Sequence, residues 1–256
     1  MNRTLQEKLA SLIRTGFVPI LVDDDFDPFV LCGAVVDAGV PAVEFTLRRN
    51  DIENIPLIRK EFPGLSLLIG STFDHPAMVS FLKKRRTFYS LEELAEMGAD
   101  GFVSMVPFHA ETYRRFAGRK LLIPGVASPG EGIEHLGFGA DLIKFVGVSP
   151  EYLKMMRSPT HGVIPIFYTG GVTLERIPSY VESGALVMGA GFEVIAGGRQ
   201  NADRAFFTER LIAYREAIAA ARKKTGCGYL SEEQDPAKLL PTTGCYIHEA
   251  QTSDSL

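Results

Sequence analysis

A single lysine interrupts one of the most apolar segments of the chain. Lys144 lies in the sequence LIKFVGV, between Ile143 and Phe145. Burying an ammonium group is costly unless it is paired with an acid or gives up its proton. A desolvated lysine amine is also a nucleophile that attacks ketones to form Schiff bases. The segment therefore indicates either a nucleophilic lysine or a lysine held in a salt bridge at a strand end.

A carboxylate and a guanidinium stand at even spacing in the segment VEFTLR. Alternate residues of a strand share one face, so Glu44, Thr46 and Arg48 would all point inward if the strand extends that far. Glu44 could then move protons, and Arg48 could hold a substrate carboxylate through paired hydrogen bonds. The alternative is that Glu44 and Arg48 pair only with each other.

Two glycine-rich turns follow two successive apolar segments near the end of the regular pattern. The first is Thr169-Gly170-Gly171 and the second is Gly189-Ala190-Gly191. Turns that expose backbone N–H groups after the last two strands of a barrel are a usual phosphate site. Each turn alone is a weak signal, and their joint position indicates binding of an anionic group.

The elements that must position these residues alternate between short apolar strands and longer helical segments. Eight strands are expected, at 17–22, 41–46, 66–71, 101–105, 121–123, 141–145, 165–168 and 185–188. They are apolar without strict alternation, as in strands covered on both faces. Helical periodicity is found at 29–38, 51–62 and 91–97, and a further helix is expected to begin at Thr173 as its N-cap. Eight such units predict a compact (β/α)8 TIM barrel, with a doubly wound open sheet as the alternative.

Three segments lie outside this repeat. An amphipathic helix is expected at the N-terminus, and residues 75–88 lengthen the connection after the third strand. An Ala-rich helix is expected at 202–224, either as the last barrel helix or as an oligomer contact. We therefore predict a barrel over residues 1–200, followed at 201–256 by a C-terminal helix and a loosely ordered polar tail.

Composition excludes several classes of protein. The chain has 256 residues, 46% of them hydrophobic and 23% charged, which is typical of a folded enzyme-sized protein. A formal charge of -4 argues against nucleic acid as a partner, and no apolar run approaches the ~20 residues of a membrane span. Three widely spaced cysteines indicate reduced thiols and a cytoplasmic location. The five histidines lack metal-site spacing, and the acidic run 23–27 is interpreted as a solvated loop rather than a Mg²⁺ site, so no metal is expected.

Taken together, six motifs resemble a known family. They are Glu44-Phe-Thr-Leu-Arg48, Ile69-Gly-Ser-Thr72, Ile123-Pro-Gly-Val-Ala127, Lys144-Phe145, Thr169-Gly-Gly171 and Gly189-Ala-Gly191. Their order and spacing over roughly residues 12–196 are similar to those of the class I 2-keto-3-deoxy-6-phosphogluconate (KDPG) aldolases, a group that includes the 4-hydroxy-2-oxoglutarate (KHG) aldolases.

The resemblance implies a role for each matching position. Lys144 would be the Schiff-base lysine for a 2-oxo acid, and Glu44 the acid/base that shuttles protons. Arg48 and Thr72 would hold the carboxylate end of the substrate. The phosphate end would lie at Thr169, Gly170, Gly171, Gly189, Ala190 and Gly191. The resemblance also implies pyruvate and an aldehyde as reaction partners, a homotrimer, and no metal or organic cofactor.

Some positions depart from the pattern of that family. Val146-Gly147 follows the lysine where the family commonly has Phe-Pro, and Gly191 stands where a serine is frequent. Asp23–Asp25 would repel a phosphate if their side chains point into the same mouth. These departures favour an aldolase for an unphosphorylated or differently decorated 2-oxo acid. Two other classes stay open: a phosphosugar isomerase, epimerase or synthase that uses Glu44 as base, and a non-catalytic phosphate-binding barrel.

Overall fold

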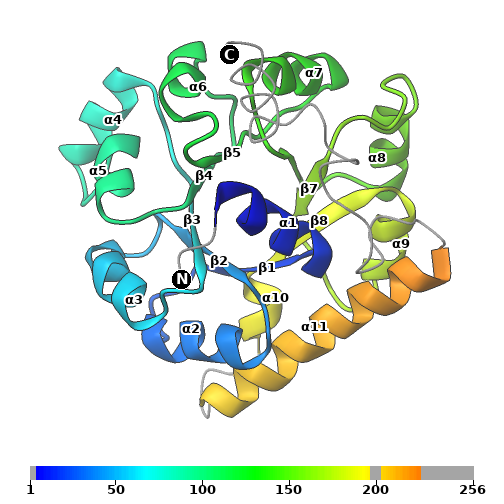
Figure 1. Ribbon diagram of the computed structural model, residues 1–256, viewed down its shortest axis with the longest axis horizontal. Coiled ribbons are helices and arrows are strands. Elements are labelled where there is room, and N and C mark those ends of the chain that lie inside the picture. The colour runs from blue at the N-terminus through cyan, green and yellow to red at the C-terminus, as the bar shows by residue number, and fades with distance from the viewer. Residues whose placement is uncertain (1–3, 197–202, 226–256) are drawn as a thin grey trace, which may run out of the picture.

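Eight parallel strands form the centre of the molecule in a computed structural model that describes residues 4–196 and 203–225 (Figure 1). The strands are β1 (Phe17–Leu21), β2 (Ala42–Thr46), β3 (Ser66–Gly70), β4 (Gly101–Val103), β5 (Leu121–Ile123), β6 (Ile143–Val146), β7 (Ile166–Thr169) and β8 (Ala185–Ala190). Their order is β5-β4-β3-β2-β1-β8-β7-β6. An isolated bridge between Gly125 and Lys144 connects the two ends of this order, so the sheet is a nearly closed barrel. The predicted TIM barrel is confirmed, with each strand within two residues of its expected bounds.

Helices surround the barrel, because each crossover between parallel strands packs an apolar helix face onto the sheet. They are α2 (Pro28–Asp37), α3 (Ile55–Glu61, after the 3-10 turn Ile52–Asn54), α4 (Pro76–Lys83), α5 (Leu91–Glu96), α6 (Ala110–Phe116), α7 (Pro129–Phe138), α8 (Pro150–Arg157), α9 (Ile177–Glu182) and α10 (Phe192–Ile195). Capping boxes begin α5 and α7, at Ser90 with Glu93 and at Ser128 with Glu131.

Two predicted helix boundaries were wrong, and a proline explains each difference. The helix expected from Thr173 begins instead at Ile177, and the helix expected over 51–62 is divided into a 3-10 turn and α3. Proline lacks an N–H and is tolerated only in the first turn of a helix. Pro178 and Pro56 therefore lie at the starts of α9 and α3, and Thr173 is not an N-cap.

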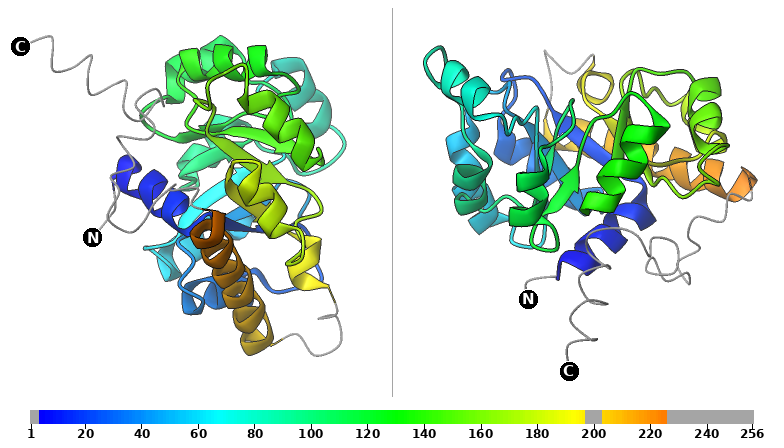
Figure 2. Two further views of the ribbon diagram at one scale, coloured as in Figure 1. Left: turned by 90° about the vertical axis from the view of Figure 1, so that its right-hand side faces the viewer. Right: turned by 90° about the horizontal axis from the view of Figure 1, so that it is seen from above.

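The N-terminal helix α1 (Leu5–Thr15) closes one end of the barrel. Leu9, Leu12 and Ile13 are buried in one cluster with inward-facing strand residues such as Leu68 and Phe167. Lys8 Nζ also lies 2.6 Å from Asp100 Oδ1. Figure 2 shows α1 at one end of the barrel and α10 at the opposite end. The carboxyl ends of the strands, where the predicted site residues lie, therefore form the remaining open end.

The long helix α11 (Arg204–Thr225) packs against α2 and α9 and completes the outer ring (Figure 1). Tyr214 stacks on Phe17 at 5.3 Å between ring centroids, and Arg222 donates to the carbonyl oxygens of Arg14 and Leu186. This agrees with the prediction of a last barrel helix. The predicted polar tail, with Cys227 and Cys245, lies outside the described residues. No helix in the described part of the chain is long and apolar enough to cross a membrane.

Candidate active site

Lys144 and Glu44 meet inside the barrel. Lys144 Nζ lies 3.5 Å from Glu44 Oε1, and the two side chains are only 4% and 2% exposed. Lys144 extends from β6, whereas Glu44 extends from β2. The two groups picked from separate segments of the sequence therefore form one buried pair. Glu44 pairs with Lys144 and not with Arg48, which answers the alternative raised by the VEFTLR segment.

Burial raises the pKa of Glu44 above its usual value, because the charged carboxylate loses its water. The nearby Lys144 opposes this shift by favouring the carboxylate form. Oε2 of Glu44 is buried and has no hydrogen-bond partner among the described residues. A buried polar atom without a partner is costly and points to a bound water or ligand. Glu44 can therefore exchange a proton with a group placed beside Oε2.

Gly70 makes the space for this carboxylate. It is the last residue of β3, and a Cβ built on it would overlap the carboxylate of Glu44. A glycine inside a strand frequently marks a close approach of another group. Gly70 belongs to the motif Ile69-Gly-Ser-Thr72, but sequence reasoning assigned it no role. Its steric role depends on the neighbouring strand and became visible only in the structure.

Lys144 lies at the seam where the barrel closes. Its N–H donates to the Pro124 carbonyl at 2.8 Å, and its carbonyl accepts from the Val126 N–H at 3.1 Å. These bonds hold the β6 backbone beside the chain that follows β5. Its ammonium also lies 5.6 Å from the centroid of the Phe167 ring on β7. The lysine is thus fixed by its backbone, while Nζ faces Glu44 in the barrel interior.

A cavity of about 230 Å³ opens beside Lys144. Besides Lys144, its lining consists of backbone and mainly apolar side chains from β6, from the segments that follow β4, β5 and β6, and from α8: Met105, Gly125, Val126, Ala127, Phe145, Val146, Val148 and Tyr152. A small organic molecule fits this volume and would contact the lysine amine. A carbonyl group bound in this cavity would lie within reach of the lysine amine.

Thr72 and Arg48 lie at the same end of the barrel in different settings. Thr72 is buried, and its hydroxyl donates to the Val103 carbonyl at 3.0 Å. β2 ends at Thr46, so Arg48 does not continue the inward face as the alternation predicted. Arg48 is exposed in the following turn, with its guanidinium 5.8 Å from the centroid of the Phe192 ring. The strand does not extend to residue 48, which was the condition for Arg48 to share the inward face of Glu44 and Thr46.

Arg49, which sequence reasoning overlooked, is the buried arginine of this turn. It donates to Asp51 and to the Phe26 carbonyl at 3.1 Å, and also to the Asp23 carbonyl. Asp24 accepts hydrogen bonds from the backbone and side-chain amides of Asn50. These hydrogen bonds therefore hold the acidic run after β1 against the turn that follows β2. The available signal in the sequence was Asp51, an acid two residues after Arg49.

The two glycine-rich turns, after β7 and after β8, differ in structure. Thr169 is buried, and Gly170 and Gly171 both have positive φ angles, of 98° and 68°. Ala190 ends β8, and the Gly191 N–H donates to Oε2 of Glu193 at 3.1 Å. A Cβ on Gly191 would lie 3.1 Å from the Ile20 carbonyl oxygen, so a larger residue needs a shift there. The β8 turn therefore already binds a carboxylate of the chain itself.

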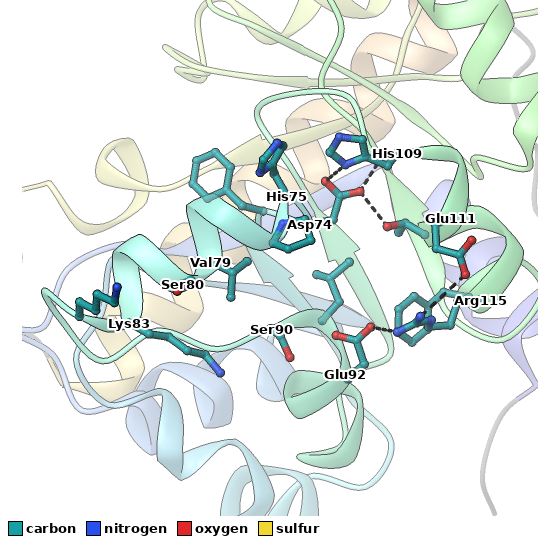
Figure 3. Close-up of a pocket in the computed structure, with 16 residues that line it drawn as sticks. Asp74, His75, Val79, Ser80, Lys83, Ser90, Glu92, His109, Glu111 and Arg115 are labelled. Carbon is teal, nitrogen blue, oxygen red and sulfur yellow. Dashed lines mark hydrogen bonds and ion pairs between the residues drawn. The ribbon is translucent and has the colours of Figure 1, made fainter.

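A second cavity, of about 820 Å³, lies between α4, α5 and α6, away from Lys144 and Glu44 (Figure 3). At its edge the carboxylate of Asp74 accepts from the backbone N–H of His109 at 2.6 Å and from Thr112 Oγ1 at 2.7 Å. The same carboxylate lies 2.8 Å from His109 Nδ1, and the ring of His75 is 5.4 Å from that of His109. The predicted insertion at 75–88 thus contains a helix, α4, that forms one wall of this cavity. Among the described residues, no group of three or more His, Cys, Asp or Glu side chains is placed to hold a metal ion.

Comparison with known proteins gives one consistent family. The family model described as KDPG and KHG aldolase matches residues 10–206. The 2-dehydro-3-deoxy-6-phosphogalactonate aldolase of Escherichia coli (strain K12) is 30% identical over 192 residues, covering 73% of this chain and 87% of that protein.

Solved structures share the fold. A structure described as native KDPGal superposes with a TM-score of 0.67 at 26% identity, covering 81% of this chain and 96% of that chain. The KDPG aldolase of Legionella pneumophila, in which pyruvate was captured at low pH as a covalent carbinolamine intermediate, gives a TM-score of 0.62 at 21% identity and covers 81% of this chain and 97% of that chain. The second likeness is evidence for the fold alone.

Proposed function

Because the chain belongs to the KDPG and KHG aldolase family, and is therefore a carbon–carbon lyase, we propose that Lys144 is its Schiff-base lysine and Glu44 its proton-transfer group. The observation that supports this most directly is the buried pair of Lys144 Nζ and Glu44 Oε1, 3.5 Å apart beside a cavity. An amine nucleophile needs a neighbouring group that takes and returns protons. The captured carbinolamine of the Legionella pneumophila enzyme is the intermediate expected of such a lysine.

In the cleavage direction, the neutral amine of Lys144 attacks C2 of a 2-oxo acid and forms a carbinolamine. Loss of water, with protonation of the leaving hydroxyl, gives a protonated imine. The C3–C4 bond then breaks, its electron pair moves toward the imine nitrogen, and the C4 hydroxyl gives up its proton as the aldehyde leaves. The resulting enamine takes a proton at C3, and hydrolysis of the imine releases pyruvate. Glu44 carries these protons, since its Oε2 has no hydrogen-bond partner among the described residues and is an acceptor on the side chain that faces Lys144.

The other substrate-binding positions are retained as part of the proposal. Thr72 would contact the carboxylate end of the substrate at the end of β3, and Arg48 would reach it from the turn after β2. The distal end would meet the turns Thr169-Gly170-Gly171 and Gly189-Ala190-Gly191. All of these positions lie at the carboxyl ends of strands, the end of such barrels that carries the active site.

Trapping with borohydride tests the proposal. We expect borohydride with saturating pyruvate to produce a reduced adduct, which peptide mapping places on Lys144. The variant Lys144→Met should give no adduct and no retro-aldol activity. Lys154→Met is the matched control, because this lysine is half exposed on α8 and pairs with Glu182. Turnover in folded Lys144→Met, or an absent adduct in the wild type, would favour an isomerase-like or non-catalytic barrel instead.

Two predictions about the whole protein are also retained: a homotrimer and a cytoplasmic location. Both come from the resemblance and the composition. Sedimentation equilibrium of the full chain tests the first, with three times the 28.1 kDa chain mass as the expected result.

A further inference from the structure

Large apolar side chains are exposed around the open end of the barrel. Met105 follows β4, Val146 ends β6, Leu174 follows β7 and Phe192 follows β8. Met105 and Phe192 are both 50% exposed. Scattered exposed apolar residues need no explanation, but a group that rims a binding cavity marks a contact site. We call these four residues the apolar rim.

Two members of the rim reach the proposed reaction site. Met105 and Val146 line the same cavity as Lys144. Among the described residues, Lys144 is the one charged side chain in that lining. The hydroxyl of Tyr152, a polar atom of the lining, already donates to the Ala127 carbonyl. A group bound next to the lysine therefore meets apolar surface.

Three backbone donors at this end of the barrel are engaged. The Ala127 N–H donates to Glu131 at 2.8 Å, and the Gly147 N–H donates to the Thr169 carbonyl at 2.8 Å. The Gly191 N–H donates to the carboxylate of Glu193. In the described part of the chain, the Gly170 and Gly171 N–H groups have no such acceptor. Two neutral donors suit a hydroxyl or carbonyl oxygen, whereas a phosphate dianion needs more donors or a cation of its own. The nearby guanidinium of Arg48, beside Phe192, is assigned above to the carboxylate end of the substrate.

We propose that the aldehyde handled by this aldolase carries no phosphate and presents an apolar surface to Met105 and Val146. This inference rests on the proposed chemistry of Lys144. A dianion placed at the β8 turn would face the Glu193 carboxylate and displace its hydrogen bond, which is unfavourable on both counts. An apolar chain would instead remove the rim from water.

The test measures aldol addition of pyruvate to three aldehydes: D-glyceraldehyde 3-phosphate, D-glyceraldehyde and butanal. We expect kcat/KM to be highest for butanal and lowest for the phosphorylated aldehyde, with about a tenfold difference or more between the two. Equal values, a preference for the phosphorylated aldehyde, or no reaction with any of the three would overturn the inference. Borohydride trapping of pyruvate in the same samples reports separately on the lysine chemistry.

A substitution at Met105 tests the location. Met105→Arg should raise the ratio of kcat/KM for the phosphorylated aldehyde over butanal by about tenfold, because it places a guanidinium in the cavity. Met78→Arg is the matched control, since Met78 is 44% exposed on α4 outside this cavity and should leave the ratio unchanged. Pyruvate trapping on Met105→Arg shows whether the site is intact.

Two results of this comparison would contradict the assignment. One is an unchanged ratio in Met105→Arg that still traps pyruvate. The other is a loss of oligomer mass in Met105→Arg with no change in ratio, which would identify the rim as a contact between copies of the chain.

Discussion

The carboxylate of Glu44 lies directly over the α-carbon of Gly70 on the neighbouring strand, in the space that a Cβ would need. This contact lets the Glu44 side chain extend within the barrel toward Lys144 without displacing the β3 backbone. The position of the Glu44 carboxylate is therefore set by a residue that has no side chain.

Gly70→Ala should abolish most of the aldolase activity. The added methyl group overlaps the Glu44 carboxylate, which must leave its present position beside Lys144. We expect a loss in kcat of about 10²-fold or more, comparable to removal of a general acid/base. Gly64→Ala is the control, because a Cβ at Gly64 meets no atom within 4 Å. Steady-state kinetics and a thermal melt of both variants check this, and full activity in Gly70→Ala would contradict it.

Glu44→Gln should lower kcat by about 10²- to 10⁴-fold and change its pH dependence. Burial raises the pKa of Glu44, so its carboxylate is lost on acidification at a higher pH than an ordinary glutamate, whose value is near 4.5. The wild-type profile should therefore fall on its acidic side above pH 4.5. A profile of kcat against pH checks this, and the same acidic limb in Glu44→Gln would assign the titration to another group.

His135 should make folding sensitive to mild acid. Burial lowers its pKa below the usual 6.5, against the opposing charges of Glu134 and Glu131, and its Nδ1 lies 2.9 Å from the Tyr113 hydroxyl. The unfolded chain then binds the proton more readily, so this contribution to stability is present above pH 6.5 and is lost as the pH falls toward the native pKa. The loss is about 1.4 kcal/mol for each unit of depression. Urea unfolding at pH 5.5 and 7.5 should show a smaller pH dependence for His135→Gln than for the exposed control His161→Gln.

Cys32 should resist alkylation in the folded protein. Burial raises the pKa of its thiol to about 12, more than the nearby Arg49 lowers it, and the thiolate is the reactive form. Iodoacetamide at pH 8 should leave Cys32 unmodified in the native state and modify it in guanidinium chloride. Mass mapping measures both, and rapid native labelling would show that α2 opens locally.

Sequence patterns predicted the strands well because every strand is covered on both faces and therefore reads as an apolar run. They were less accurate for Arg48, since the chain leaves the strand at Thr46 and alternation no longer applies. Pro178 and Pro56 mark the observed starts of α9 and α3, because proline is tolerated only in the first turn of a helix. The predicted starts followed the apolar periodicity instead.

For the site, residue chemistry singled out Lys144 and Glu44 as candidates, because charged residues are seldom buried in an apolar strand unless they are paired. Their approach to 3.5 Å is a property of the closed barrel, which places β2 and β6 across from each other. The role of Gly70 and the bond from Gly191 to Glu193 depend on atomic contacts between and within loops. Such contacts have no periodic signature in a sequence.

In the described part of the chain, the helix α1 fills one end of the barrel with Leu9, Leu12 and Ile13, so substrate and products are expected to pass through the opposite end. In the proposed mechanism pyruvate stays bound to Lys144 until its imine is hydrolysed, which comes after the aldehyde has formed, so the aldehyde is free to leave first. Cleavage should therefore release its products in a fixed order, aldehyde first and pyruvate second. In steady-state product inhibition, pyruvate should compete with the 2-oxo acid substrate, while the aldehyde should inhibit noncompetitively.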